Sequence, residues 1–198
     1  MDAGHVITPS VGRTDYPGAF MALKPTIYKT RIALSDIERG YYDTLNLTIA
    51  RHPSETLERM MVRVLAFCIN AQEQLVFTKG LCAVDEPDIW VRTLGGDVTL
   101  WIDVGEPAVD RIKKATRLSA AVKVYSFNSK SAVWWHQGQA RFNELSVSVY
   151  QLSWESVQAM AALVQRTMDL SITITGDSAY VAAQAGECEV SWVPLQVS

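Results

Sequence analysis

The sequence predicts one α/β or α+β domain, with a mixed β-sheet flanked by helices. Its 198 residues suit a single domain of ordinary size. Stretches with the two-residue alternation of a strand recur between stretches with the periodicity of a helix. No internal repeat, low-complexity linker or change of composition divides the chain. We therefore expect one domain over 21–198 and a disordered or non-native tail over 1–20, where glycines and prolines occur without periodicity.

The first elements predicted are a hairpin and a long helix. β-Branched or aromatic residues alternate with polar ones over 26–34 and over 44–50, which indicates two strands. Ser54 is a favourable N-cap for a helix over 54–72. Glu58 lies beside the apolar stripe of this helix, so it either points into a cleft or pairs with an arginine at the boundary of the core.

A second hairpin is predicted around Gly95-Gly96, because glycine tolerates the positive φ of a tight turn. It follows a strand over 75–82, and we place Leu94 opposite Asp97. This register pairs Arg92 with Thr99, Trp90 with Trp101, and Asp88 with Asp103. Opposed carboxylates cost stability unless a cation lies between them. The alternative is an ordinary pair of solvated acids at the strand ends.

The later elements alternate between helices and strands. Helices are predicted over 107–119, 131–142 and from Ser153 to 168, and strands over 122–127, 145–152, 170–175, 179–183 and 188–193. In the helix over 131–142, adjacent Trp134 and Trp135 either stack on bases or, for at least one of the pair, belong to the core. His52 and His136 have no ligand-like spacing, so we do not assign them to a metal.

Composition narrows the possible partners and the compartment. A net charge of −3 and a sequence pI of about 5.6 argue against a wholly basic nucleic-acid-binding surface but leave room for a local basic groove. Three widely spaced cysteines, Cys68, Cys82 and Cys188, indicate thiols used as small apolar groups in a reducing compartment, so we expect a cytoplasmic protein. We expect no membrane association, since neither a spanning segment nor a signal peptide is apparent.

Charged residues in the middle of the chain could support phosphate chemistry. Carboxylates at strand ends, here Asp88 and Asp103, are typical ligands of Mg²⁺. Lys113 and Lys114 follow on the next helix, where an ammonium group could stabilise charge on a phosphate or orient a water molecule. No phosphate-binding glycine loop, GxSxG elbow or HExxH helix is present.

Several segments resemble the YaeQ family of bacterial proteins, from Met21 to the C-terminus. They are MALKPTIYK from Met21, RHPSETLERMMVRVLAF from Arg51, FTKGLC from Phe77, DEPDIW from Asp85, LWIDVG from Leu100 and RIKKA from Arg111. The resemblance implies a compact variant of the PD-(D/E)xK nuclease fold. Its restriction-endonuclease-like core would be helix–three strands–helix–strand, with extra strands at both ends.

The resemblance also implies roles for particular residues. Asp88 matches the acid of the PD element, and Asp103 matches the D/E position. Gly105 occupies the usual lysine position, so Lys113 or Lys114 would have to supply that group. Glu58 matches the acid that many such nucleases carry on the first helix. Asp85 and Glu86 are reserve candidates if the register is shifted.

Two functions are therefore expected from the sequence. The first is a metal-dependent phosphodiesterase acting on nucleic acid, with Mg²⁺ or Mn²⁺ bound by Asp88, Asp103 and Glu58. The second is a catalytically inactive nuclease-like scaffold that serves as a protein-interaction or regulatory protein. The missing lysine at Gly105 favours the second, whereas a basic surface beside the acids would favour the first.

Overall fold

The computed structural model describes residues 24–79 and 85–198. Four helices are present in this part of the chain: α1 (Leu57–Ile69), α2 (Val109–Leu118), α3 (Ser131–Phe142) and α4 (Trp154–Ala162). Ten strands accompany them: β1 (Thr26–Asp36), β2 (Tyr41–Arg51), β3 (Leu75–Phe77), β4 (Ile89–Arg92), β5 (Val98–Val104), β6 (Ser119–Ser126), β7 (Ser148–Leu152), β8 (Thr167–Thr175), β9 (Ser178–Ala183) and β10 (Gly186–Gln196). The predicted tail over 1–20 and Cys82 lie outside the described residues.

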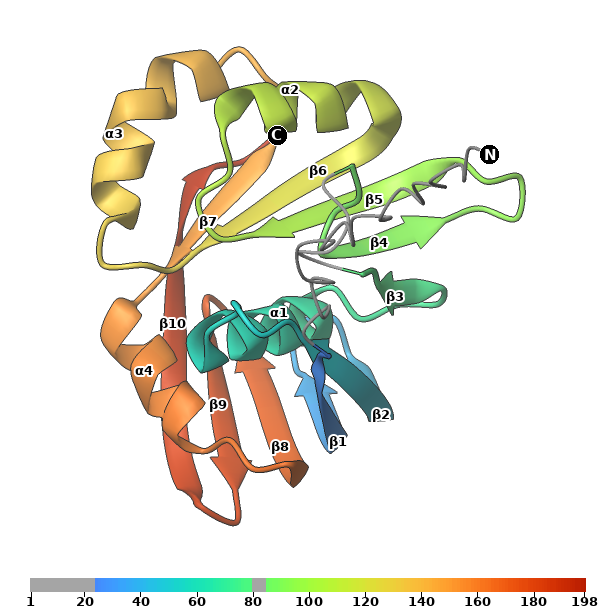
Figure 1. Ribbon diagram of the computed structural model, residues 1–198, viewed down its shortest axis with the longest axis vertical. Coiled ribbons are helices and arrows are strands. Elements are labelled where there is room, and N and C mark those ends of the chain that lie inside the picture. Colours follow the sequence, from blue (N-terminus) through green and yellow to red (C-terminus); the bar gives the residue numbers. More distant parts are fainter. Residues whose placement is uncertain (1–23, 80–84) are drawn as a thin grey trace, which may run out of the picture.

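All ten described strands belong to one mixed sheet in the order β2-β1-β8-β9-β10-β7-β6-β5-β4-β3. The pairs β1–β8, β5–β6 and β6–β7 are parallel, and the other neighbours are antiparallel. The sheet curls so strongly that it nearly closes around α1, while α2 and α3 cover its other face at the top of the view (Figure 1). The predicted mixed α+β fold is confirmed at this level.

Two apolar cores result from this arrangement. The larger core joins α1 and α4 to the concave face of the sheet, and Met60, Met61 and Leu65 of α1 are almost fully buried there. The smaller core joins α2 and α3 to the outer face, where Ile112 and Phe142 are completely buried. Because α1 contacts strands on both sides, its buried surface extends beyond the single stripe that the sequence suggested.

The start of α1 differs from the prediction. Thr56, not Ser54, is the N-cap, and its hydroxyl accepts a hydrogen bond from the backbone N–H of Arg59 at 3.2 Å. Ser54 instead lies 2.6 Å from Nδ1 of His52. The Glu55 carboxylate is therefore placed just before the helix, where it pairs with arginines of the first turns.

The end of α4 also differs from the prediction. Ser153 is the N-cap as expected, but the helix ends at Ala162 rather than at Met168. Thr167 and Met168 are the first residues of β8, because they pair in parallel with Lys29 and Thr30 of β1. Pairing between strands far apart in the sequence therefore overrides the local helical pattern. The N-terminal hairpin and the three closing strands are confirmed.

The β4–β5 hairpin has a three-residue loop instead of the predicted two-residue turn. Thr93 and Asp97 close the loop through an N–H···O bond of 2.8 Å, and Gly96 adopts φ +95°. Leu94 is thus in the loop, and Arg92 pairs with Val98, not with Thr99. A register shift between Val91 and Arg92 then restores the predicted Trp90–Trp101 pair.

The structure also tests the predictions for the helix over 131–142 and for Cys68. The helix over 131–142 is confirmed, and Trp135 is a core residue stacked on Phe142. Cys68 is buried in α1, and burial raises the pKa of its thiol to about 12, so it behaves as a small apolar group. Within residues 24–79 and 85–198, no helix combines the length and apolar character needed to cross a membrane.

Candidate functional site

The two predicted acids lie where β4 and β5 approach the helices. Both are buried, with Asp88 4% and Asp103 2% exposed. The regular ladder ends at Ile89–Ile102, and the N–H of Asp88 donates to the carbonyl of Ile102 at 3.0 Å. Asp88 is therefore not directly opposite Asp103, as the predicted register required. The irregular backbone at this point turns the two carboxylates toward different helices.

Asp88 is held by α1 and by the backbone of β5. Nη2 of Arg59 donates to both carboxylate oxygens, at 2.7 and 2.8 Å, and also approaches the carbonyl of Val104 at 3.3 Å. The N–H of Val104 donates to Oδ2 of Asp88 at 2.8 Å. The side chain thus replaces a backbone partner at the point where the ladder stops, which satisfies a buried N–H group.

Asp103 is held by α2. Arg111 donates to Oδ1 at 2.8 Å and to Oδ2 at 2.9 Å, a two-point pair that fits the planar guanidinium. Arg111 also donates to the carbonyl of Glu86 at 2.7 Å, so it connects α2 to the segment before β4. Burial raises the pKa of Asp103 above its usual value, and Arg111 opposes this shift without cancelling it.

A chain of charges extends from Asp88 into the core. Arg59 also donates to Oε1 of Glu55 at 2.7 Å, and Glu55 in turn accepts from Nη2 of Arg63 at 2.7 Å. The side chains of Glu55 and Arg63 are 2% and 3% exposed. The Glu55–Arg59 pair joins residues four positions apart, whereas its continuation to Asp88 spans 29 positions. Since every charge in this chain has a partner, the cluster links α1 firmly to the β4–β5 edge.

The other predicted site residues lie apart from the two acids. Lys114 pairs with Asp85 at 2.6 Å on the surface, and Lys113 is exposed. Glu58 is half-buried on α1. The backbone carbonyl of Glu86 accepts a hydrogen bond from Arg111. The side chains that pair with Asp88 and Asp103 are those of Arg59 and Arg111. The one signal in the sequence that could have identified these arginines is their position on helices next to the acids.

Gly105, which the nuclease resemblance aligns with a lysine, has φ +108°. This left-handed conformation disfavours any residue with a Cβ atom. A Cβ atom built at Gly105 meets no atom within 4 Å, so the restriction is in the backbone and not in the space available. Within residues 24–79 and 85–198, no three His, Cys, Asp or Glu side chains are grouped in a way that could hold a metal ion.

Comparison with known proteins places this chain and its fold in a family. A model of the family described as "YaeQ protein" matches residues 21–192. The chain belongs to the YaeQ family. It is 42% identical to the YaeQ protein of Escherichia coli K12 over 178 residues, which are 89% of this chain and 98% of that relative. It is 39% identical to the YaeQ protein of Salmonella typhi over an alignment of the same length.

Crystal structures of YaeQ proteins share the fold. The YaeQ protein of Xanthomonas axonopodis pv. citri superposes with a TM-score of 0.85 at 35% identity, covering 88% of this chain and 99% of that one. The YaeQ protein of Pseudomonas syringae gives a TM-score of 0.84 at 33% identity, covering 88% and 97% of the two chains. The YaeQ family name specifies no reaction, so the chemistry must be argued from the site itself.

The site contains four charges close enough to interact. Burial of Asp103 is accompanied by repulsion from Asp88, which also raises the pKa of Asp103. Each acid is neutralised by one arginine, Arg59 or Arg111. A divalent cation would have to displace a guanidinium group before it could use either carboxylate. The two ion pairs connect α1 and α2 to the β4–β5 hairpin. Lys113 and Lys114 of α2 remain exposed.

Proposed function

We propose that the protein is a catalytically inactive nuclease-like scaffold that acts by binding, as an interaction or regulatory protein. The observation that carries this proposal is that Asp88 and Asp103 are each committed to an arginine on a different helix. An acid that serves as a structural partner is not available as a metal ligand without breaking a buried ion pair.

Two further observations support the proposal. The order α1-β3-β4-β5-α2-β6, with β5 parallel to β6, is the order of elements implied by the PD-(D/E)xK resemblance. At the lysine position of that pattern, Gly105 has a positive φ that a lysine would adopt only with strain. On this proposal the scaffold keeps the order of elements of a nuclease core. Its two acids serve as ion-pair partners of arginines, and a glycine occupies its lysine position.

A metal-dependent nuclease is the second candidate, and a specific observation favours it. Asp88 and Asp103 remain near enough to repel each other, and Arg111, which pairs with Asp103, lies on the same helix as the exposed Lys113 and Lys114. Two carboxylates plus water are an adequate ligand set for Mg²⁺ or Mn²⁺. When bound there, the ion would supply a Lewis acid and an activated water. Arg111, once it no longer pairs with Asp103, would contribute a guanidinium group to phosphate binding.

A calorimetric Mn²⁺ titration distinguishes the two candidates. We expect no stoichiometric binding to the wild-type protein, and detectable binding to Arg111→Gln, because that substitution frees the Asp103 carboxylate. Lys114→Gln is the matched control, since it removes the same charge from the same helix but from an exposed pair. Asp103→Asn in the Arg111→Gln background should abolish the binding to that variant.

The opposite result would decide for the nuclease. If the wild-type protein binds Mn²⁺ stoichiometrically, and Asp103→Asn removes this binding, the arginines are displaceable and the scaffold proposal is wrong. Incubation of the same proteins with single-stranded and duplex nucleic acid in Mn²⁺ then tests cleavage. Cleavage by the wild type that is absent in Asp103→Asn would establish the second candidate.

A further inference from the structure

The outer face of β3, β4 and β5 carries a row of apolar side chains. Val76, Trp90 and Trp101 lie side by side, because Val76 pairs with Trp90 and Trp90 pairs with Trp101. Their neighbours along β4, Ile89 and Val91, belong to the core around α1, so the row points away from that core. Val76 is 48% exposed and Trp90 is half-buried, whereas Trp101 is buried beside α2.

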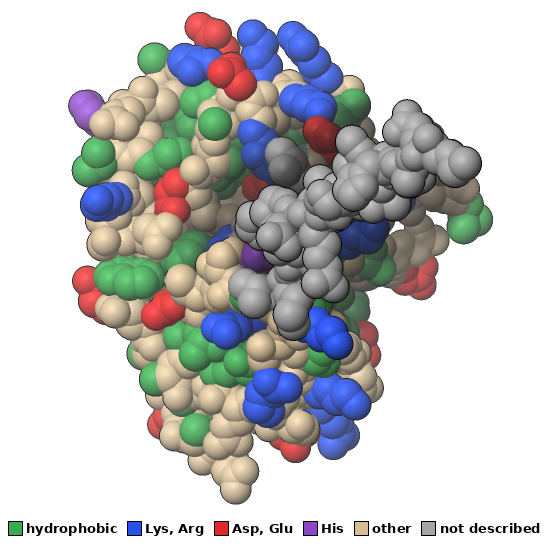
Figure 2. All heavy atoms as spheres, in the orientation of Figure 1, with side chains coloured by type: hydrophobic (Ala, Val, Ile, Leu, Met, Phe, Trp, Pro, Cys, Tyr) green, Lys and Arg blue, Asp and Glu red, His purple; other side chains and the backbone are tan. Residues whose placement is uncertain are grey.

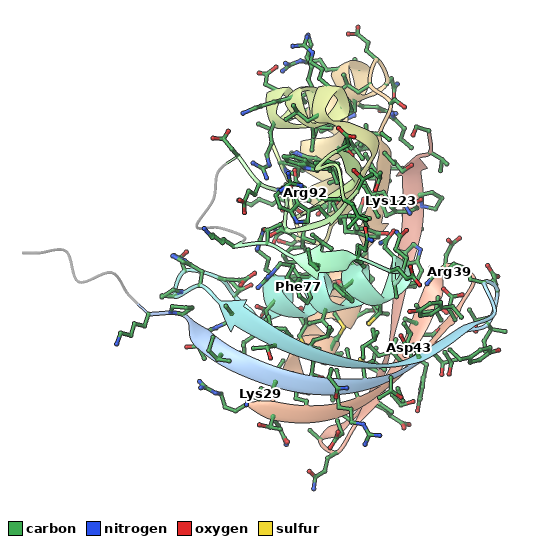
Figure 3. All side chains as sticks on the ribbon, turned by 90° about the vertical axis from the view of Figure 1, so that its right-hand side faces the viewer. Lys29, Arg39, Asp43, Phe77, Arg92 and Lys123 are labelled. Carbon is green, nitrogen blue, oxygen red and sulfur yellow. The ribbon has the colours of Figure 1, made fainter. Side chains whose placement is uncertain are left out.

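Each tryptophan in this row is covered by an arginine. The guanidinium carbon of Arg92 lies 4.9 Å from the ring centre of Trp90, and that of Arg111 lies 5.8 Å from the ring centre of Trp101. Arg92 is exposed and also donates to the carbonyl of Gly96 at 3.0 and 3.1 Å. In Figure 3, Arg92 lies on the side of the hairpin toward α2, whereas Phe77 lies beside α1. The two Arg–Trp layers are therefore held on the outer side of the hairpin.

A pocket adjoins this row at its buried end. It has a volume of about 220 Å³ and is lined by Asp85, Trp101, Arg111 and Lys114. Beyond it, Lys113 and Arg117 are exposed along α2, and Figure 2 shows lysine and arginine side chains over this helix at the top of the view, with some acids among them. Among the described residues that line the pocket, Arg111 and Lys114 are cationic and Asp85 is acidic, whereas the protein as a whole is negatively charged.

We propose that this face binds single-stranded nucleic acid. The inference rests on the proposed binding function and names its partner. A base stacks on the Arg92–Trp90 layer, and the neighbouring phosphates lie toward Arg111 and Lys114. Aromatic rings flanked by cations fit a strand whose base faces are exposed, because stacking and backbone attraction act together. A duplex keeps its base faces covered and offers this face only its phosphates. Binding of a protein partner would not require an arginine against each tryptophan ring.

The first test measures strand binding without divalent metal. Fluorescence anisotropy of a labelled oligothymidylate of about 12 nucleotides, in EDTA, gives the dissociation constant. We expect Trp90→Leu to weaken binding about tenfold, since leucine keeps the apolar contact but has no aromatic face. Trp90→Phe should bind within about threefold of the wild type, because the ring is retained. Equal melting temperatures of the two variants verify that both are folded.

A second test measures the charge contribution. For single strands, the slope of log K against log salt concentration changes by about 0.7 for each phosphate that the protein no longer neutralises. Lys114→Gln removes a cation that the proposal places toward the phosphates, and it should reduce the slope by about this amount. Arg31→Gln, an equal charge change at an exposed position of β1, is the matched control and should leave the slope unchanged. Trp90→Leu should weaken binding while leaving the slope unchanged.

The results separate this inference from the proposed function. Equal binding by Trp90→Leu and the wild type, a preference for duplex over single strand, or no binding to either would overturn the inference. These measurements are made in EDTA, so they do not depend on metal binding by the carboxylates. The Mn²⁺ titration reports on Asp103 alone. The scaffold proposal can therefore fail while strand binding stands, and strand binding can fail while Asp103 still binds no metal.

Discussion

Arg111 donates hydrogen bonds to both carboxylate oxygens of Asp103, yet the two side chains differ greatly in solvent exposure. The side chain of Arg111 is 31% exposed, whereas that of Asp103 is 3% exposed. The pair therefore lets a surface residue neutralise an acid that is inside the protein. The loss of either partner has unequal consequences, because only Asp103 would be left charged and buried.

Arg111→Gln should lower the free energy of unfolding by about 2 kcal/mol, because it leaves a buried carboxylate without its cation while water still reaches part of the site. Urea denaturation at neutral pH measures the change. Arg141→Gln is the control, since its pair with Asp110 is exposed on both sides. We expect that substitution to change stability by less than about 0.5 kcal/mol. Equal effects of the two would show that the Asp103 pair is no stronger than a surface pair.

Glu55→Gln should destabilise the protein by about 3 kcal/mol, because Glu55 is shared by Arg59 and Arg63 and is almost fully buried. Glu58→Gln, three residues further along and half-buried, is the matched comparison. It should cost less than about 1 kcal/mol. Chemical denaturation of both variants gives the difference directly, and a larger loss for Glu58→Gln would contradict the assignment of Glu55 as the linking acid.

The stability contributed by Asp103 should depend on pH in a definite direction. Its pKa in the folded protein is raised above 3.8, mainly by burial. The folded state therefore holds the proton more tightly, so the contribution of Asp103 is greatest below pH 3.8 and is lost as the pH rises through the folded pKa. The difference in unfolding free energy between wild type and Asp103→Asn should thus fall as the pH increases above this value. A difference that rises with pH would mean that Arg111 outweighs burial.

Gly105→Lys, which introduces the residue that the nuclease resemblance implies at this position, should destabilise the protein. The positive φ of Gly105 predicts a loss of about 1–2 kcal/mol for any residue with a Cβ atom. Gly105→Ala is the control, and it should lose a similar amount because the space around the Cβ position is open. Thermal unfolding of both variants measures the loss. A far larger effect of lysine than of alanine would place the restriction in the side-chain environment instead.

The fold was predictable where local patterns and pairing agree. The Trp90–Trp101 pair follows from alternation, and it survives a wrong turn because the longer loop and the register shift near Arg92 cancel. The end of α4 was not predictable in this way. The strand character of Thr167 and Met168 depends on β1, whose residues lie more than a hundred positions earlier.

The site was predictable in part. The buried position of Asp103 follows from the apolar run before it, and its need for a partner follows from burial. The identity of that partner depends on how α2 packs on β5. Likewise, Asp88 and Arg59 are 29 residues apart, and they meet only because the ladder stops at Ile89. Alternation alone assigns Asp88 to the same face as Asp103, whereas the irregular backbone turns it toward α1.

The place of β1 in the sheet has a consequence for synthesis on the ribosome. β1 lies between β2 and β8, so the first hairpin has an unpaired edge until residues 167–175 emerge. Until then α1 lacks part of the surface that buries it, and its apolar side chains face water or a chaperone. The final closure joins distant segments of the chain, which makes it slow compared with hairpin formation. Truncation before β8 should therefore yield an aggregating product and not a smaller folded domain.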